Sequence, residues 1–243
     1  MRTGASAIII GNEVLTAKVT EANGSHLISR LRERGVLLHS VHFVLDDVDA
    51  IVEALQLARR KAKWVFTSGG IGPTHDDVTV RAVALALGRP VVRLPEMEAL
   101  VKLQYGEGAT AEAMRLADAP EGAELLYQAG ARYPVLACED VYLLPGVPQL
   151  FKHQLETVLA RLPVTAVNIQ VLYLSASEAE IARVLDQVAL AMPDVAIGSY
   201  PNFDPEQDYR VKLTIEHASA APVAEAVQRL EAVLPKGCLL RRE

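Results

Sequence analysis

Short β-branched runs alternate with helical patterns through the first 160 residues, and this alternation constrains the fold more than any other feature of the sequence. The apolar runs at 5–10, 37–44 and 64–67 have the length of strands. Between them, segments 22–34 and 48–61 carry apolar residues at the spacing of one helix face. Strands separated by helices pair in parallel, because each parallel connection needs a long crossover. We therefore predict an α/β domain with a mostly parallel sheet.

The remaining 80 residues follow a different pattern. The predicted elements are, in order, strand 166–173, helix 178–191, strand 195–200, strand 209–217, helix 222–234 and strand 238–241. This βαββαβ order is typical of a ferredoxin-like α+β domain. A proline at position 163 ends the preceding helical pattern, so we predict two domains, 1–163 and 164–243.

Charge excludes one large class of function. The chain has 24 Lys and Arg against 30 Asp and Glu, a formal net charge of −6, and no basic run longer than 59–61. Proteins that follow a phosphate backbone usually present a basic face. We therefore expect no nucleic acid among the partners.

The sequence also indicates where in the cell the protein is expected. The longest apolar stretches are strand-length and interrupted by polar residues, so we expect no membrane span. The first four residues lead directly into a short strand without the features of a secretory signal, and we expect a cytoplasmic protein. Cys138 and Cys238 have no CxxC partner and no nearby His, which favours buried free thiols over a disulfide or a zinc site.

A glycine-rich segment at 67–79 stands between a predicted strand and a predicted helix. Ligands bind outside the carboxyl ends of parallel strands, which is where this segment lies. Gly69, Gly70 and Gly72 allow the backbone to approach a ligand closely and to direct N–H groups toward an anion. The segment is neither a Walker A loop nor a GxGxxG fingerprint, because His75 occupies the place of the last glycine.

Asp76 and Asp77 follow these glycines after three further residues. Adjacent carboxylates beside a phosphate site are suited to Mg²⁺, which takes oxygen ligands and bridges to substrate phosphates. Thr74 and Asp77 also match a capping box, so either aspartate has an alternative interpretation as a helix cap. The spacing leaves both interpretations open, and the neighbouring glycines favour the metal site.

Two further loops join predicted strands to helices. Loop 143–148 contains Pro145, Gly146 and Pro148, and its prolines make it stiff enough to form one wall of a binding site. Loop 11–15 brings Glu13 to the same edge of the sheet. Taken alone, the 143–148 loop is better explained as an ordinary turn, and Glu13 alone is weak evidence for a site.

At these loops the sequence resembles the molybdopterin-binding (MoaB/Mog) fold, and in particular the competence-damage-inducible A family. The motifs that carry the resemblance are GNEVL at 11–15, GGIGPTHDDVT at 69–79 and LPGVP at 144–148, in the family's order and spacing. Weaker agreement occurs at Asn23, 46–47, 84–90, 114–117, 120–123 and 198–201. The resemblance covers nearly the whole chain.

This resemblance implies a three-layer α/β/α sandwich, a homo-oligomer, and a site for a nucleotide or pterin phosphate. Related proteins are metal-dependent pyrophosphatases of ADP-ribose or FAD, or they bind or adenylylate molybdopterin with Mg²⁺. The implied metal ligands and catalytic residues are Asp76, Asp77 and Glu13, with Mg²⁺, Mn²⁺ or Co²⁺ as the ion. The implied ligand-binding residues are Asn12, Asn23, Ser68, Gly69, Gly70, Ile71, Gly72, Thr74, Pro145, Gly146 and Pro148.

Some positions depart from the family pattern. Asn12 stands where the family usually has Asp, and 127–134 matches a family loop only in part. The loss of a carboxylate at 12 favours a binding protein, whereas the paired aspartates favour catalysis. The sequence also ends at Glu243, so we expect no nicotinamide-nucleotide deamidase domain after it. Metal-dependent pyrophosphate hydrolysis is the first hypothesis, and non-catalytic binding or adenylylation of molybdopterin is the alternative.

Overall fold

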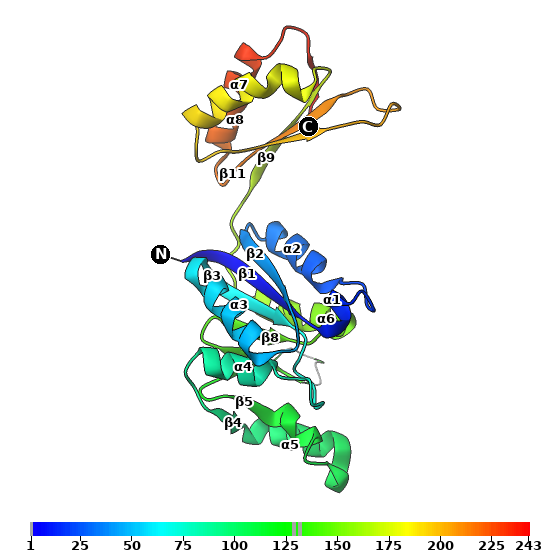
Figure 1. The fold of residues 1–243 in the computed structure, drawn as a ribbon. Coiled ribbons are helices and arrows are strands. Elements are labelled where there is room, and N and C mark those ends of the chain that lie inside the picture. Colours follow the sequence, from blue (N-terminus) through cyan, green and yellow to red (C-terminus); the bar gives the residue numbers. More distant parts are fainter. Residues whose placement is uncertain (1, 128–129, 131–132) are drawn as a thin grey trace. The chain divides into compact units, whose positions relative to one another are not determined.

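The computed structural model describes residues 2–127, 130 and 133–243 (Figure 1). The chain divides into two compact units, Met1–Val164 and Thr165–Glu243. Each unit has its own sheet and its own hydrophobic core.

The larger unit is built on a six-stranded sheet. In spatial order its strands are β2 (Leu38–Val44), β1 (Thr3–Ile10), β3 (Ala62–Ser68), β8 (Val141–Leu144), β7 (Val135–Cys138) and β6 (Glu124–Leu126). The first four strands pair in parallel, and β7 and β6 pair antiparallel. This arrangement confirms the predicted mostly parallel sheet.

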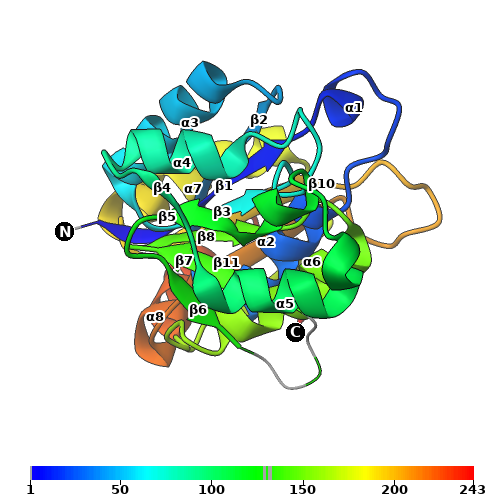
Figure 2. The same cartoon turned by 90° about the horizontal axis from the view of Figure 1, so that it is seen from below.

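Helices cover both faces of this sheet (Figure 2). They are α2 (Asn23–Glu33) and α6 (Pro148–Leu159) on one face, and α3 (Val48–Lys61) and α4 (Thr79–Ala86) on the other. Strand β1 shows why both faces are filled: Ala5 and Ala7 pack under the first pair, and Ile8 and Ile10 pack under the second. Alternate residues of a strand point to opposite faces, so a strand buried on both sides is apolar throughout.

Smaller elements complete the larger unit. They are α1 (Asn12–Leu15), β4 (Val91–Arg93), α5 (Pro95–Tyr105), the 3-10 helices η1 (Gly106–Gly108) and η2 (Ala113–Ala117), and β5 (Asp118–Pro120). Strands β4 and β5 form a separate antiparallel pair. Helix α5 and η2 share a small core that contains Met97, Val101, Ala113 and Ala117.

The structure differs from the sequence expectations in these smaller elements. The segment that we predicted as a helix at 111–117 is the short 3-10 helix η2, and α1 and β5 were not predicted. For the other α-helices, the spacing of apolar residues was sufficient to predict their presence. Asp47 is the N-cap of α3, since its carboxylate accepts a hydrogen bond from the backbone N–H of Ala50 at 2.9 Å.

The smaller unit has the predicted βαββαβ order. Its elements are β9 (Asn168–Leu174), α7 (Glu178–Ala191), β10 (Ala196–Pro201), β11 (Val211–His217), α8 (Ala220–Val233) and β12 (Leu239–Arg242). The strands form an antiparallel sheet in the order β10-β11-β9-β12. Both helices pack on this sheet, and a capping box between Ser177 and Glu180 begins α7.

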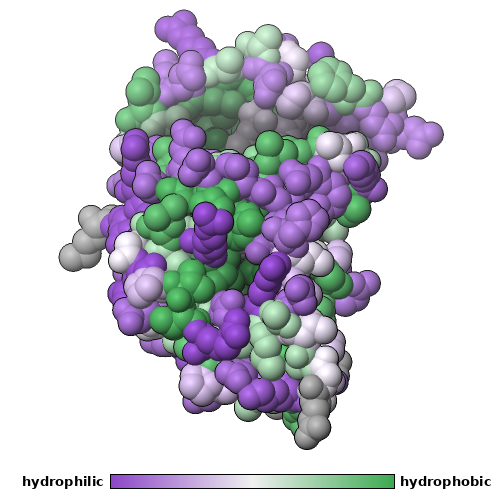
Figure 3. Space-filling view, turned by 60° about the horizontal axis from the view of Figure 1, so that its bottom comes forward, coloured by the Kyte–Doolittle hydropathy of each residue, from purple (hydrophilic) through white to green (hydrophobic). Residues whose placement is uncertain are grey.

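The surface drawn in Figure 3 has apolar side chains gathered in a patch that hydrophilic side chains interrupt. Helices α3 and α4 carry two exposed leucines, Leu57 and Leu85. Within the described residues, no helix is long and apolar enough to cross a membrane.

We predict that a fragment of residues 1–164 folds by itself. Its core of α2, α6 and the sheet, and its core of α3, α4 and the sheet, draw all their members from the larger unit. The fragment should show a cooperative thermal transition by near-ultraviolet and far-ultraviolet circular dichroism. A molten fragment that loses its near-ultraviolet signal would contradict this expectation.

Candidate functional site

The turn after β3 brings the backbone into close contact with neighbouring elements. Gly69 and Gly70 have φ angles of 104° and 64°, which side chains rarely permit. A Cβ on Gly69 would collide with the carbonyl oxygen of Ile10, and a Cβ on Gly70 would collide with Oγ1 of Thr79. Both glycines are therefore required by local packing.

Thr79 stabilises this turn with two hydrogen bonds. Its buried hydroxyl donates to the carbonyl of Gly69 at 2.9 Å, and its backbone N–H donates to the carbonyl of Gly70, also at 2.9 Å. Thr79 is also the first residue of α4. One threonine thus joins the glycine turn to the start of the following helix.

The capping interpretation of Thr74 and Asp77 is wrong. Helix α4 begins at Thr79, its N-cap is Val78, and no side chain caps it. The carboxylate of Asp77 instead accepts hydrogen bonds from the backbone N–H of Thr74, at 2.8 Å, and from the Thr74 hydroxyl. These bonds close a tight turn before the helix, with Asp76 exposed within it.

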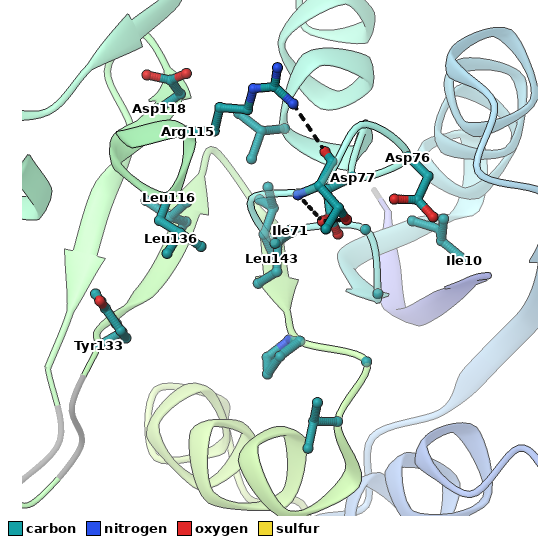
Figure 4. Close-up of a pocket in the computed structure, with 18 of the residues that line it drawn as sticks. Ile10, Ile71, Asp76, Asp77, Arg115, Leu116, Asp118, Tyr133, Leu136 and Leu143 are labelled. Carbon is teal, nitrogen blue, oxygen red and sulfur yellow. Dashed lines mark hydrogen bonds between the residues drawn. The ribbon is translucent and has the colours of Figure 1, made fainter. Parts of the chain in front are cut away.

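A cavity of about 560 Å³ opens beside this turn (Figure 4). It lies where β1, β3 and β8 end, since residues at or just beyond their carboxyl ends, including Ile10, Gly69 and Pro145, line it. This is the position expected for a ligand site in a parallel sheet. Among the predicted site residues, the cavity is lined by Glu13, Gly69, Gly70, Ile71, Gly72, Thr74, Asp76, Asp77, Pro145 and Gly146.

One end of the cavity is acidic. Glu13 from α1, Asp46 from the β2–α3 loop, and Asp76 and Asp77 from the turn after β3 all line it. Burial raises the pKa of Asp46, and the neighbouring carboxylates of Glu13, Asp76 and Asp77 raise it further. The four carboxylates line one cavity and together make this end negative.

Hydrogen bonding within its own turn lowers the pKa of the Asp76 carboxyl. This group is therefore ionised at neutral pH. Hard carboxylate oxygens are the ligands that Mg²⁺ and Mn²⁺ prefer, so the acidic end fits a divalent cation chemically. In the described part of the chain, no three His, Cys, Asp or Glu residues form a ready ligand group. A cation held here would need water or substrate oxygens to complete its shell, as Mg²⁺ usually does.

The other end of the cavity is mostly apolar. Figure 4 shows Leu116, Leu136 and Tyr133 across the cavity from Asp76, with Leu143 between the two sides. Leu116 belongs to η2, whereas Leu136 and Leu143 belong to the antiparallel pair β7 and β8. A ligand that fills the whole cavity must therefore combine a charged part with an apolar part.

The remaining predicted residues are not among the described residues that line the cavity. The buried amide of Asn23 donates to Oγ of Ser68 at 2.9 Å and to the carbonyl of Gly146 at 2.7 Å, which joins two of the predicted loops. The backbone N–H of Asn12 donates to Asp46 at 2.8 Å, and Oδ1 of Asn12 accepts from the backbone N–H of Asp46 at 3.4 Å. Pro148 begins α6. None of Asn12, Asn23, Ser68 and Pro148 is among the lining residues that the structure describes.

Sequence reasoning missed three lining residues that carry charge near the turn. Asp46 was noted only through the weaker family agreement at 46–47, yet it lines the cavity, while its neighbour Asp47 caps α3. Arg81 from α4 and Arg115 from η2 stand in segments without an obvious ligand motif. Position 127–134 includes residues 128–129 and 131–132, which lie outside the described part of the chain.

Comparison with protein families agrees with this architecture. Residues 6–164 match the family described as a probable molybdopterin binding domain, which is more than half of the chain. The chain belongs to this family. Residues 166–243 match a second family, described as the FAD synthase middle domain. The resemblance predicted from the sequence motifs is thereby confirmed for the larger unit.

Individual relatives extend the comparison. A protein of Archaeoglobus fulgidus is 33% identical over 195 residues, which cover 80% of this chain and 84% of that protein. A probable FAD synthase of Caenorhabditis elegans is 30% identical and covers 96% of this chain, which spans 50% of that protein. The crystal structure of the protein CinA, of unknown function, from Thermoplasma acidophilum is 29% identical with a TM-score of 0.61. That match covers 65% of this chain and 96% of the Thermoplasma chain, and it confirms the predicted likeness to this group.

We predict that Gly70→Ala destabilises the protein more than Gly88→Ala. The two glycines have similar φ angles of 64° and 66°, but only Gly70 has an atom within reach of an added Cβ, namely Oγ1 of Thr79. Gly88→Ala should cost about 1 kcal/mol for the left-handed backbone, and Gly70→Ala at least about 1 kcal/mol more for the collision. Urea denaturation measures both values, and equal losses would show that the turn gives way without cost.

We predict that Asp46→Asn stabilises the protein at pH 7 in the presence of EDTA. The raised pKa means that the folded state binds a proton more tightly than the unfolded state, so stability falls as pH rises through this pKa. The variant lacks that loss, and its advantage should shrink toward about pH 4, where an ordinary Asp becomes protonated. Thermal melting between pH 4 and pH 7 measures the difference, and a constant difference would contradict the assignment to Asp46.

Proposed function

We propose that this protein is a divalent-metal-dependent pyrophosphatase that cleaves a nucleoside diphosphate-linked substrate such as ADP-ribose or FAD. The observation that carries the proposal is the division of one cavity into an acidic end beside a glycine turn and an apolar end across from it. A dinucleotide-type substrate has the same two parts, a charged pyrophosphate and a flat ring.

The glycine turn suits the pyrophosphate. Gly69, Gly70 and Gly72 line the cavity without side chains, so phosphate oxygens can approach the backbone closely. The acidic carboxylates alone would repel such an anion. Glu13, Asp46, Asp76 and Asp77 are therefore assigned to hold a divalent cation, which makes the region compatible with phosphate.

A bound divalent cation would neutralise charge on the phosphates and lower the pKa of a water molecule for attack on phosphorus. Asp77 presents its carboxylate in one orientation, because two hydrogen bonds from Thr74 fix that group. Leu116, Leu136 and Leu143 exclude water from the far end and bind the ring of the substrate. Among the described residues that line the cavity there is no serine, cysteine or lysine, which favours water as the nucleophile.

The relatives support the nucleotide class of substrate. The smaller unit matches the FAD synthase middle domain, and the Caenorhabditis elegans relative is called a probable FAD synthase. A second candidate function is non-catalytic binding or adenylylation of molybdopterin, in line with the description of the family that residues 6–164 match. The specific observation that favours it is Asn12, which pairs with Asp46 by hydrogen bonds but adds no carboxylate to the acidic end.

We predict that the protein cleaves ADP-ribose or FAD at the pyrophosphate only when Mg²⁺, Mn²⁺ or Co²⁺ is present. The products should be AMP and the second monophosphate, and EDTA should abolish their formation. Asp77→Asn should lower the rate on the order of 100-fold, as expected when a charge-stabilising group is removed. Its melting temperature should change little because no helix cap is lost.

The matched control is Asp186→Asn, which removes an exposed carboxylate from α7 in the smaller unit and should leave the rate unchanged. Chromatographic separation of the nucleotide products measures all three proteins. Activity that persists in EDTA would overturn the mechanism. Binding of these ligands without cleavage, both in the wild type and in Asn12→Asp, would favour the molybdopterin-binding alternative.

A further inference from the structure

Arg115 connects the η2 segment to the acidic turn. One of its terminal nitrogens, Nη1, donates to the carbonyl oxygens of Pro73 and Thr74, at 3.5 Å and 3.3 Å. Only His75 separates these two residues from the Asp76–Asp77 pair, and Figure 4 shows Arg115 above Asp77 at the cavity. The exposed guanidinium is thus held by backbone oxygens, without any ion pair between Arg115 and a described carboxylate.

The two carbonyl contacts leave one edge of the guanidinium available. A guanidinium carries five N–H groups, and both of those on Nη1 are directed to Pro73 and Thr74. The Nε and Nη2 groups form the opposite fork, and no hydrogen bond joins them to any described residue. Two parallel N–H groups at this spacing match two oxygens of one phosphate.

The charges that line the cavity indicate what this edge can bind. Asp118, the lining carboxylate beyond the acidic end, is already paired with Nε of Arg93 at 2.9 Å. Among the described lining residues, the only Lys or Arg side chains are Arg81 and Arg115. An anion that enters the glycine turn therefore depends on very few positive side chains.

We propose that Arg115 is the phosphate-binding residue of this cavity and that it grips the substrate phosphate through its Nε–Nη2 edge. The inference rests on the proposed phosphate substrate and adds a residue to which no role has been given. Pro73 and Thr74 orient the guanidinium before the ligand arrives, which reduces the entropy lost on binding. Lysine would supply the charge at this position but not the two-point contact.

The experiment measures binding of inorganic pyrophosphate and of Mn²⁺ by isothermal titration calorimetry. The proteins are the wild type, Arg115→Gln, Arg115→Lys and the control Arg161→Gln. Arg161 is an exposed arginine of the same unit, and its ion pair with Glu124, at 3.2 Å, lies away from the cavity lining. Pyrophosphate is titrated with Mg²⁺ present in both solutions, and Mn²⁺ is titrated without pyrophosphate.

We expect Arg115→Gln to bind pyrophosphate at least tenfold more weakly than the wild type, while Mn²⁺ binds equally well or more tightly. Loss of a positive charge beside carboxylates should favour the cation and disfavour the anion. Arg115→Lys should show an intermediate loss of pyrophosphate affinity, and Arg161→Gln should bind as the wild type does.

A parallel loss of both affinities in Arg115→Gln would overturn the proposal, because it would mean that Arg115 only holds the turn. Wild-type pyrophosphate affinity in Arg115→Gln or in Arg115→Lys would also overturn it, and so would a wild type that binds no pyrophosphate. If Arg115→Gln does not fold, Arg115→Lys decides the outcome. The pyrophosphatase proposal fails separately if the protein cleaves no substrate or binds no Mn²⁺, while Arg115→Gln still weakens pyrophosphate binding.

Discussion

The contact between the glycine turn and the elements beneath it determines the rest of the site. Gly69 lies against the end of β1, and Gly70 lies against Thr79, so the turn has no room for a side chain on either residue. Thr79 then fixes the start of α4 through two hydrogen bonds to the turn. Because the backbone is fixed at these glycines, the residues that follow them leave the sheet in one direction and form the closed turn that lines the cavity.

The acidic end is assembled from elements that are distant in the sequence. Short helix α1 supplies Glu13, and the loop before α3 supplies Asp46. Adjacent aspartates in that loop have different tasks, since Asp47 caps α3 while Asp46 faces the other carboxylates. Like charges placed together lower the stability of a fold, and such an arrangement is retained where it serves a site.

Periodic patterns in the sequence were sufficient for the two sheets and for most helices. Buried strands such as β1 are apolar on both faces, and the helix pattern of α3 agrees with its observed bounds. Short-range spacing was less reliable: the Thr74–Asp77 pair matches a capping box, but the helix starts two residues after Asp77. Asp46 and Arg115 gain their importance only from the folded arrangement, because the groups near them come from other segments of the chain.

The excess of negative over positive side chains around the cavity also affects how a ligand reaches it. Glu13, Asp46, Asp76 and Asp77 create a field that slows the approach of a free polyanion and attracts a cation. A phosphate compound that already carries its metal ion has a smaller net charge and meets less repulsion. Under the proposed function the productive encounter is with the metal complex of the ligand, and added salt, which screens the field over about 10 Å at 0.1 M, should speed the arrival of the free anion instead of slowing it.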